Sequence, residues 1–334
     1  MKLSRTPFLV DDTAFCVCDV DMERKSKQFL KAIDADYFRY IAEIHSENLN
    51  DEKDRIRASM VLRTTYYQAL ETFFSLVGAL LQAHKCEYAF IMKANTFNLK
   101  KLIGKINESP EKIQHIYLSD DVITWQRISE IVYDGIVTDN KLTFVEGYAR
   151  SWKKFSFDFL DDNHRNEFNS LKHGFRVSSG GFKMLFGPEV KPGIECKPKD
   201  MKLIGESDFG STFFVANNLQ ESESIRNDPY FCTKMHSLNW SAENTANALN
   251  LLYMSIKNIK AHLLYRNGEP AGNLDFIGFK DENYFNAPWE SNVGLVSSNM
   301  DFPVYEKDIV RLTQKELKKQ IIANKTKAES QGNY

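Results

Sequence analysis

Four polar side chains on one short stretch of this sequence are the residues best placed to do chemistry. Asn169, Lys172 and His173 stand at positions i, i+3 and i+4, so a helix places them on one face. Arg165 precedes Asn169 by about one helical turn and extends that face. An imidazole titrates in the range that proton transfer needs, and a nearby cation can stabilise a charged transition state. The pattern therefore predicts acid–base chemistry on an anionic group such as a phosphodiester.

The same stretch also has a purely structural interpretation. Basic side chains in a last helical turn complement the exposed carbonyl groups, and a glycine just past the helix end takes the left-handed cap conformation. Leu171-Lys172-His173-Gly174 fits this description with no function attached. Both interpretations are compatible with the sequence.

Arg63 interrupts an otherwise apolar stripe on the clearest predicted helix, over 51–84. A guanidinium among apolar neighbours needs hydrogen-bond acceptors. Glu71 lies two turns away on the same helix, too far for a direct contact, so we expect Arg63 to reach the 158–173 region. The alternative is that Arg63 extends to the edge of the helix and pairs with any nearby carboxylate. The acceptors available in the 158–173 region are Asp158, Asp161, Asp162, Glu167 and the side-chain oxygen of Asn169.

Charge and hydropathy narrow the function classes. The chain has 334 residues with 43 basic and 45 acidic side chains, and its formal net charge is −2. This balance predicts no general attraction to nucleic acid or anionic membrane, so a nucleic-acid site has to be a local patch. No apolar run approaches the roughly 18 residues of a membrane span, and the N-terminus lacks the apolar core of a signal peptide. We expect a cytoplasmic protein with no membrane partner.

The motifs indicate no cofactor and no metal. The sequence contains no G-x-x-x-x-G-K-[ST], G-x-G-x-x-G, H-E-x-x-H or G-x-S-x-G pattern. Its five cysteines are odd in number, and only Cys16 and Cys18 are close together, so neither a disulfide framework nor a zinc site is predicted. On a strand these two side chains point the same way, and we expect both to be small apolar core residues.

Hydrophobic periodicity predicts a mainly α fold, a helical bundle with a small β-hairpin or antiparallel sheet in the C-terminal half. An extended segment is expected over 8–20, and a hairpin is expected to join 201–203 to 213–215 around Asp208-Phe209-Gly210. Asp161-Asp162-Asn163 offers N-cap residues for one helix, and Ser241 is expected to cap another. The helices are predicted over 23–48, 51–84, 90–106, 110–117, 121–133, 146–160, 164–173, 242–264 and 305–323, the last with an apolar face of Ile309, Leu312, Leu317 and Ile321.

This pattern divides the chain into four parts. They are an extended N-terminal segment over 1–22, a helical bundle over 23–175, an α+β region over 176–323 packed on the bundle, and a polar tail over 324–334.

Two of these helices together resemble a known superfamily. A long helix reading Arg63-Thr64-Thr65-Tyr66-Tyr67-Gln68-Ala69-Leu70-Glu71, followed later by a helix ending Asn169-x-x-Lys172-His173-Gly174, is similar to bacterial helical proteins of the HEPN-like group. The resemblance covers at most residues 23–175. Members are helical bundles, often dimers, and many are endoribonucleases of toxin–antitoxin or phage-defence systems. The nuclease members carry four to six residues between an Arg and a His on one helix, whereas seven separate Arg165 from His173 here.

The resemblance implies RNA and a second copy of the chain as partners. It makes His173, Lys172, Arg165 and Asn169 the candidate catalytic residues, with Arg63 and Glu71 in a supporting role. One hypothesis is therefore an RNA-binding protein or metal-independent endoribonuclease of a bacterial defence or toxin–antitoxin system. The misfit in spacing favours the other hypothesis, a non-catalytic helical interaction or scaffold protein. The two differ in geometry, because catalysis requires Lys172 and His173 to line a cleft, whereas a cap does not.

Overall fold

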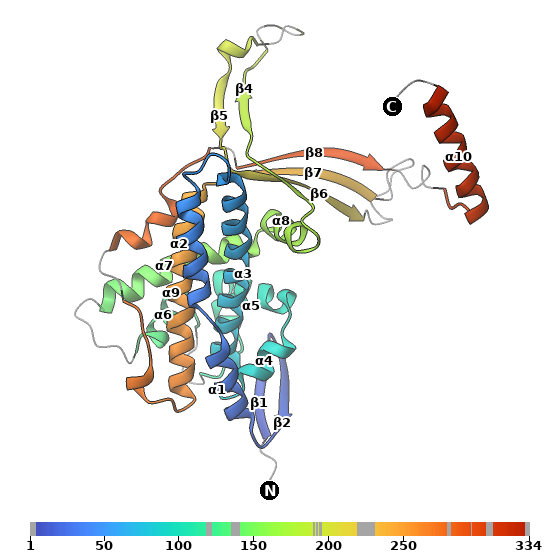
Figure 1. Cartoon of the computed structure of the whole chain (residues 1–334). Coiled ribbons are helices and arrows are strands. Elements are labelled where there is room, and N and C mark those ends of the chain that lie inside the picture. Colours follow the sequence, from blue (N-terminus) through green and yellow to red (C-terminus); the bar gives the residue numbers. More distant parts are fainter. Residues whose placement is uncertain are drawn as a thin grey trace. The chain divides into compact units, whose positions relative to one another are not determined.

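Two long helices, α3 (Arg55–Gln82) and α9 (Ala242–Arg266), lie side by side at the centre of the helical bundle (Figure 1). The second half of α3 is apolar on nearly every side and almost entirely buried, as expected for a helix enclosed by neighbours. Helix α9 begins as predicted at Ser241, whose Oγ accepts a hydrogen bond from the Asn244 backbone nitrogen at 3.0 Å. Because α9 comes from the C-terminal half, the bundle continues past the residues 23–175 in which we expected it.

The structure, a computed structural model, describes residues 5–117, 122–134, 141–189, 191, 193, 196–218, 231–278, 282–294, 296–304 and 310–330. The chain divides into two compact units. The helical unit comprises Met1–Phe213 and Ser237–Ser298, and the small unit comprises Phe214–His236 and Asn299–Tyr334.

Shorter helices surround the central pair. Their bounds are α1 (Met22–Ala32), α2 (Asp36–Asn48), α4 (Glu87–Lys93), α5 (Thr96–Glu108), α6 (Trp125–Val132), α7 (Lys141–Leu160) and α8 (Asp162–Lys172). The single helices predicted over 23–48 and 90–106 are each two helices, and the second break occurs where Asn95 caps α5 by accepting from the Asn98 backbone nitrogen at 2.9 Å. The helix predicted over 110–117 is a short 3₁₀ turn, Pro110–Lys112.

The N-terminal extended segment is a hairpin of β1 (Arg5–Val10) and β2 (Thr13–Cys18). Cys16 and Cys18 point the same way along β2, but both are exposed, so the prediction that they are core residues is wrong. The register explains the difference. Phe15 pairs with the buried Phe8, so the alternate residues of β2 take the inner face and leave the two thiols on the outer one.

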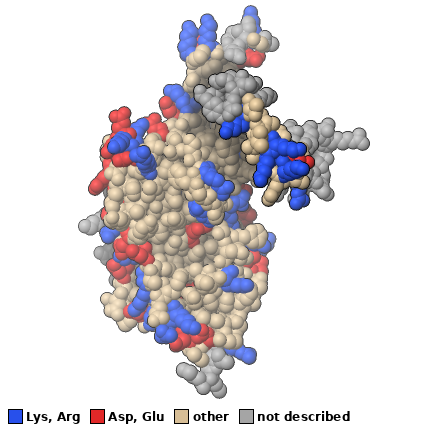
Figure 2. Space-filling view, turned by 45° about the vertical axis from the view of Figure 1, so that its right-hand side comes forward, with Lys and Arg blue, Asp and Glu red and all other residues tan. Residues whose placement is uncertain are grey.

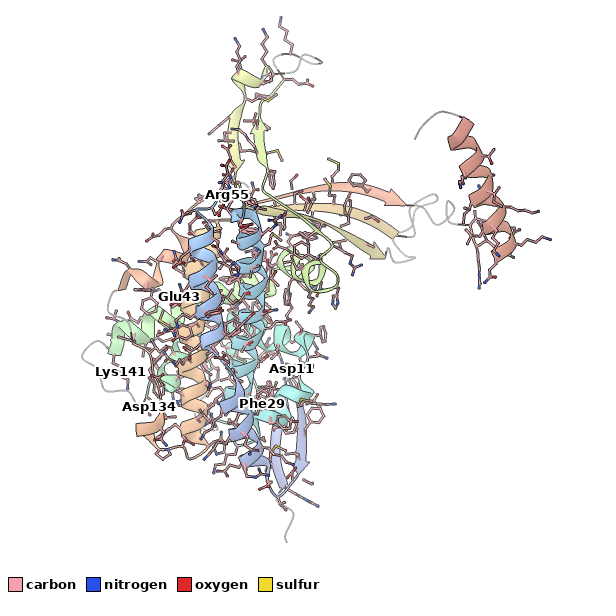
Figure 3. All side chains as sticks on the ribbon, in the orientation of Figure 1. Asp11, Phe29, Glu43, Arg55, Asp134 and Lys141 are labelled. Carbon is pink, nitrogen blue, oxygen red and sulfur yellow. The ribbon has the colours of Figure 1, made fainter. Side chains whose placement is uncertain are left out.

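The C-terminal strands pair differently from the predicted hairpin. Strand β5 (Lys202–Glu206) pairs with β4 (Lys183–Phe186), not with β6 (Gly210–Asn218). A four-stranded sheet instead runs in the order β3-β6-β7-β8, with β3 (Val177–Ser179), β7 (Phe231–Asn239) and β8 (Ser297–Val304). Gly210 lets the start of β6 approach Leu238 of β7 closely, because a Cβ there would lie 2.3 Å from the Leu238 carbonyl oxygen. Arg55 lies at the start of α3 (Figure 3) and pairs with Asp208, just before β6, at 3.0 Å.

The predicted fold class is confirmed, because the described residues form ten α-helices and three small antiparallel sheets. The last helix, α10 (Gln314–Ser330), begins and ends later than the predicted 305–323. Leu312, Leu317 and Ile321, which we expected to form its buried face, are all exposed, and Ile309 lies outside the described residues. Within the described part of the chain, none of the helices combines the length and the apolar character that crossing a membrane requires.

Candidate functional site

Helix α8 carries the candidate catalytic residues, and its two ends are fixed by caps. At its start, Asp161 is the one of the three N-cap candidates that caps the helix, and its carboxylate accepts a hydrogen bond from the His164 backbone nitrogen at 2.9 Å. At its end, Gly174 takes a left-handed φ of 100°, and the Phe175 nitrogen donates to the Leu171 carbonyl at 3.1 Å. The cap geometry inferred from the glycine is therefore present.

The four candidate catalytic side chains are all exposed, and the structure does not gather them around a cleft. Arg165 pairs with Asp162 of its own helix at 3.0 Å. Lys172 lies over the Phe168 ring, and its ammonium group is 3.9 Å from Glu71. The remaining two, Asn169 and His173, lie on the surface of the last turn and just beyond it.

Arg63 reaches α8, as the interrupted stripe predicts. Its Nε and Nη2 atoms donate to the same oxygen of Glu167, at 3.1 and 3.0 Å, and both side chains are buried. Tyr67 donates to that oxygen as well, while Ser211 donates to the other carboxylate oxygen at 2.5 Å. The pair thus ties α3 to α8 and to the first residues of β6, and every oxygen of the buried carboxylate has a donor.

Electrostatics keep both partners of this pair ionised. Burial alone would raise the pKa of the Glu167 carboxyl, but Arg63 and the hydrogen bonds from Ser211 and Tyr67 hold that pKa below its ordinary value. Burial also opposes the charge on Arg63, yet the Glu167 carboxylate raises the pKa of the guanidinium overall. The guanidinium lies 4.9 Å from the centre of the Tyr67 ring and 5.2 Å from that of the Trp240 ring, so aromatic faces cover it.

A cleft of about 450 Å³ opens beside Arg63 in the helical unit. Its walls come from α3, from the junction of α7 and α8, from the start of α9 and from the segment over 288–297. Trp240 and Trp289 contribute aromatic surface, and Trp240 is buried with its Nε1–H lacking an acceptor among the described residues. The cleft therefore combines aromatic walls with polar groups, as small-molecule binding sites do.

Three polar side chains meet on one wall of this cleft. Tyr66 donates to Asp158 at 2.5 Å, and burial together with this carboxylate raises the pKa of Tyr66 well above its ordinary value, so the hydroxyl stays a donor. The Nδ1 atom of His164 is 3.3 Å from the Asp158 backbone oxygen and 3.8 Å from its carboxylate. With Nδ1 engaged there, Nε2 of His164 has no partner among the described groups and is available to a ligand.

Two cations of α7 lie near Trp289, one and two turns before Asp158. The Lys154 ammonium group is 4.2 Å from the centre of the Trp289 ring, and Arg150 precedes it by about one turn of α7. Burial, and then the charge of Arg150, lowers the pKa of Lys154. Neither cation has a carboxylate partner within the described residues. On the face shown in Figure 2, positive and negative side chains are interspersed over the helical body.

The reach of Arg63 and a cap within Asp161-Asp162-Asn163 could be predicted from the sequence, but the cleft could not. Tyr66, His164, Trp240 and Trp289 come from four separate segments, so no local spacing links them. The one usable signal was composition, because the chain has four Trp and two of them line this cleft. Among the described residues, no group of three or more His, Cys, Asp or Glu side chains could hold a metal ion. Comparisons with protein-family models, with curated proteins and with solved structures find no match to this chain.

Proposed function

We propose that this protein binds RNA, and that the cleft beside Arg63 accepts an unstacked nucleobase. The observation that carries the proposal is a 450 Å³ cleft with two tryptophan side chains in its walls. Proteins that recognise single-stranded RNA stack splayed bases on aromatic rings and bind the base edges with polar side chains. RNA is also the ligand that the HEPN-like resemblance implies.

The charges of the cleft agree with a base inside and a phosphate outside. Asp158 and Asp161 line the cleft and repel a phosphate, but their oxygens can accept hydrogen bonds from the amino group of a base. The amide of Asn163 and Nε2 of His164 supply further groups for a base edge. Lys154 and Arg150 offer positive charge next to Trp289, where the phosphate of a bound nucleotide would lie.

We further propose that binding occurs without cleavage by the residues of α8. Arg165, Lys172 and His173 are exposed, and neither Lys172 nor His173 lines the cleft. Geometry of this kind favours the structural interpretation of the helix end, and with it the non-catalytic alternative. Only the HEPN-like resemblance supports three further proposals, which are endoribonuclease activity, a role in defence and a homodimer.

Binding is tested by titrating a fluorescently labelled single-stranded RNA with the full-length protein at low salt in EDTA. Trp289→Ala should weaken binding about tenfold or more, because stacking on one aromatic ring is worth about 1–3 kcal/mol per base. Trp289→Phe should restore most of the affinity. Phe157→Ala is the matched control, since Phe157 is an exposed aromatic residue of α7 that does not line the cleft.

The binding proposal fails if Trp289→Ala and Phe157→Ala bind RNA as wild type does while circular dichroism shows both to be folded. A second variant, Lys154→Ala, gives an independent result. It should weaken mononucleotide binding, followed by quenching of tryptophan fluorescence, if the phosphate lies next to Trp289.

Cleavage is tested in the same buffer by incubating labelled RNA with wild-type protein and with His173→Ala. We expect intact RNA in both samples. Fragments that appear with wild type and disappear with His173→Ala would overturn the non-catalytic proposal and restore the endoribonuclease hypothesis.

A further inference from the structure

The small unit exposes two aromatic rings on the face of its sheet. Phe214 of β6 is 58% exposed and Phe302 of β8 is 44% exposed, and their ring centroids are 5.7 Å apart. Because the rings touch, both side chains must lie on the same face of the sheet. Met300 of β8 is exposed as well. Large apolar side chains gathered in this way on a surface usually mark a binding site.

The helix of the same unit carries positive charge without compensation. Lys315, Lys318, Lys319 and Lys325 fall on one broad side of α10, and Arg311 precedes the helix. None of these five cations has a carboxylate within 4.0 Å among the described residues. Of the acids whose side chains the structure describes in this unit, Asp301 pairs with Lys234 and Glu316 caps α10 at Thr313.

We propose that the small unit is a second RNA-binding surface, on which the Phe214–Phe302 pair stacks bases of a single strand and the α10 lysines bind its phosphates. Exposed aromatic rings and unpaired cations are the two elements from which binding sites for single-stranded nucleic acid are built. The inference shares the ligand class of the proposed function and rests on it to that extent, but its residues are different. It makes the partner a strand of several nucleotides rather than a single nucleotide.

The pattern of α10 favours a polyanion over the other common partners of a basic helix. A helix that lies on a membrane, or in a protein groove, needs an apolar stripe that continues over several turns. Here Leu317 and Ile321 begin such a stripe, but Asn324 occupies the next position of it. Ile322 instead lies among the lysines, at about 100° from Ile321. The continuous feature of this helix is its charge.

The experiment compares a 12-nucleotide single-stranded RNA with a mononucleotide, using the full-length protein. The double variant Phe214→Ala/Phe302→Ala should weaken oligonucleotide binding about tenfold and leave mononucleotide binding unchanged. Replacing the four α10 lysines by Gln should lower the slope of log affinity against log salt by about 3, because each phosphate contact on a single strand contributes about 0.7. Phe97→Ala is the control for both, since Phe97 is an exposed aromatic residue of the helical unit.

The outcomes separate this inference from the proposed function. If Trp289→Ala has no effect while the small-unit variants weaken oligonucleotide binding, the cleft proposal fails and this inference stands. If only Trp289→Ala weakens binding, this inference is overturned. Binding of the wild type to phosphatidylserine vesicles, with no binding to the oligonucleotide, would overturn it in favour of a lipid surface.

Discussion

The Arg63–Glu167 pair shows that one charged residue in an otherwise apolar helix stripe can predict a contact with a distant segment of the chain. A guanidinium in an apolar stripe had to find acceptors, and the sequence placed them in the 158–173 region, where the structure has them. The choice among five acceptors was not predictable. It depends on which side of α8 faces α3, and Glu167 lies beside the buried Phe168 on that inner side. Glu71 instead approaches Lys172.

Arg63→Ala should lower the free energy of unfolding by about 3–5 kcal/mol, because it leaves the buried Glu167 carboxylate without its cation. Arg63→Lys should recover only part of this loss, since an ammonium group lacks the planar fork that donates twice to one carboxylate. Urea unfolding measures both. Arg165→Ala is the control, as Arg165 is exposed and its loss should change stability by no more than about 0.5 kcal/mol. Equal effects at the two positions would contradict the argument.

The same pair predicts a dependence on acid. The pKa of Glu167 is lower in the folded state than its ordinary value of 4.5, so the carboxylate contributes stability above that pH. This contribution is lost as the pH falls through the folded pKa. The unfolding free energy of wild type, measured between pH 7 and pH 3, should therefore fall relative to that of Arg63→Met/Glu167→Leu as the pH drops below about 4.5. A difference that stays constant over this range would show that Glu167 is not the group responsible.

At the scale of elements, local patterns predicted helices well and strand pairing poorly. The 3-and-4 spacing of apolar residues located α3, α7 and α9, because a helix is determined by neighbours within one turn. The hairpin expected around Gly210 was wrong, since β6 pairs with β3 and β7 and not with β5. No local pattern in β5 or β6 distinguishes these partners, because strand pairing depends on contacts that only the folded chain brings together. One such contact is the close approach of Gly210 to Leu238.

Two glycines in helices should respond oppositely to alanine. In α7, a Cβ at Gly147 would lie 2.4 Å from the ring of the buried Phe285, so Gly147→Ala should cost about 1–3 kcal/mol through overpacking. In α5, a Cβ at Gly104 would meet nothing within 4 Å, so Gly104→Ala should add about 0.5–1 kcal/mol through helix propensity. Thermal unfolding of the two variants measures the difference. A gain of stability at Gly147 would mean that Phe285 does not pack there.

At the scale of the whole molecule, the sequence predicted the mainly α class but not how the chain is divided. The boundary expected after residue 175 rested on a change of composition. In the structure the chain leaves the helical unit after Phe213, returns at Ser237 and leaves again after Ser298. Such a division follows contacts between residues far apart in the sequence, and no local signal marks it. The near-neutral net charge likewise concealed the unpaired cations of α10.

A protein truncated after Val304 should keep the stability of the helical unit and lose part of its affinity for the oligonucleotide. The described side chains that it removes are all exposed, so the urea midpoint of the helical unit should not change. For the 12-nucleotide RNA, the slope of log affinity against log salt concentration should be smaller by about 3 in the truncated protein than in wild type. The reason is that truncation removes the same four lysines that the Gln variant replaces. It should still bind a mononucleotide, because the cleft lies within the helical unit. A lower urea midpoint would mean that residues 305–334 stabilise the fold, and the lysines of α10 would then have to be judged from the Gln variant alone.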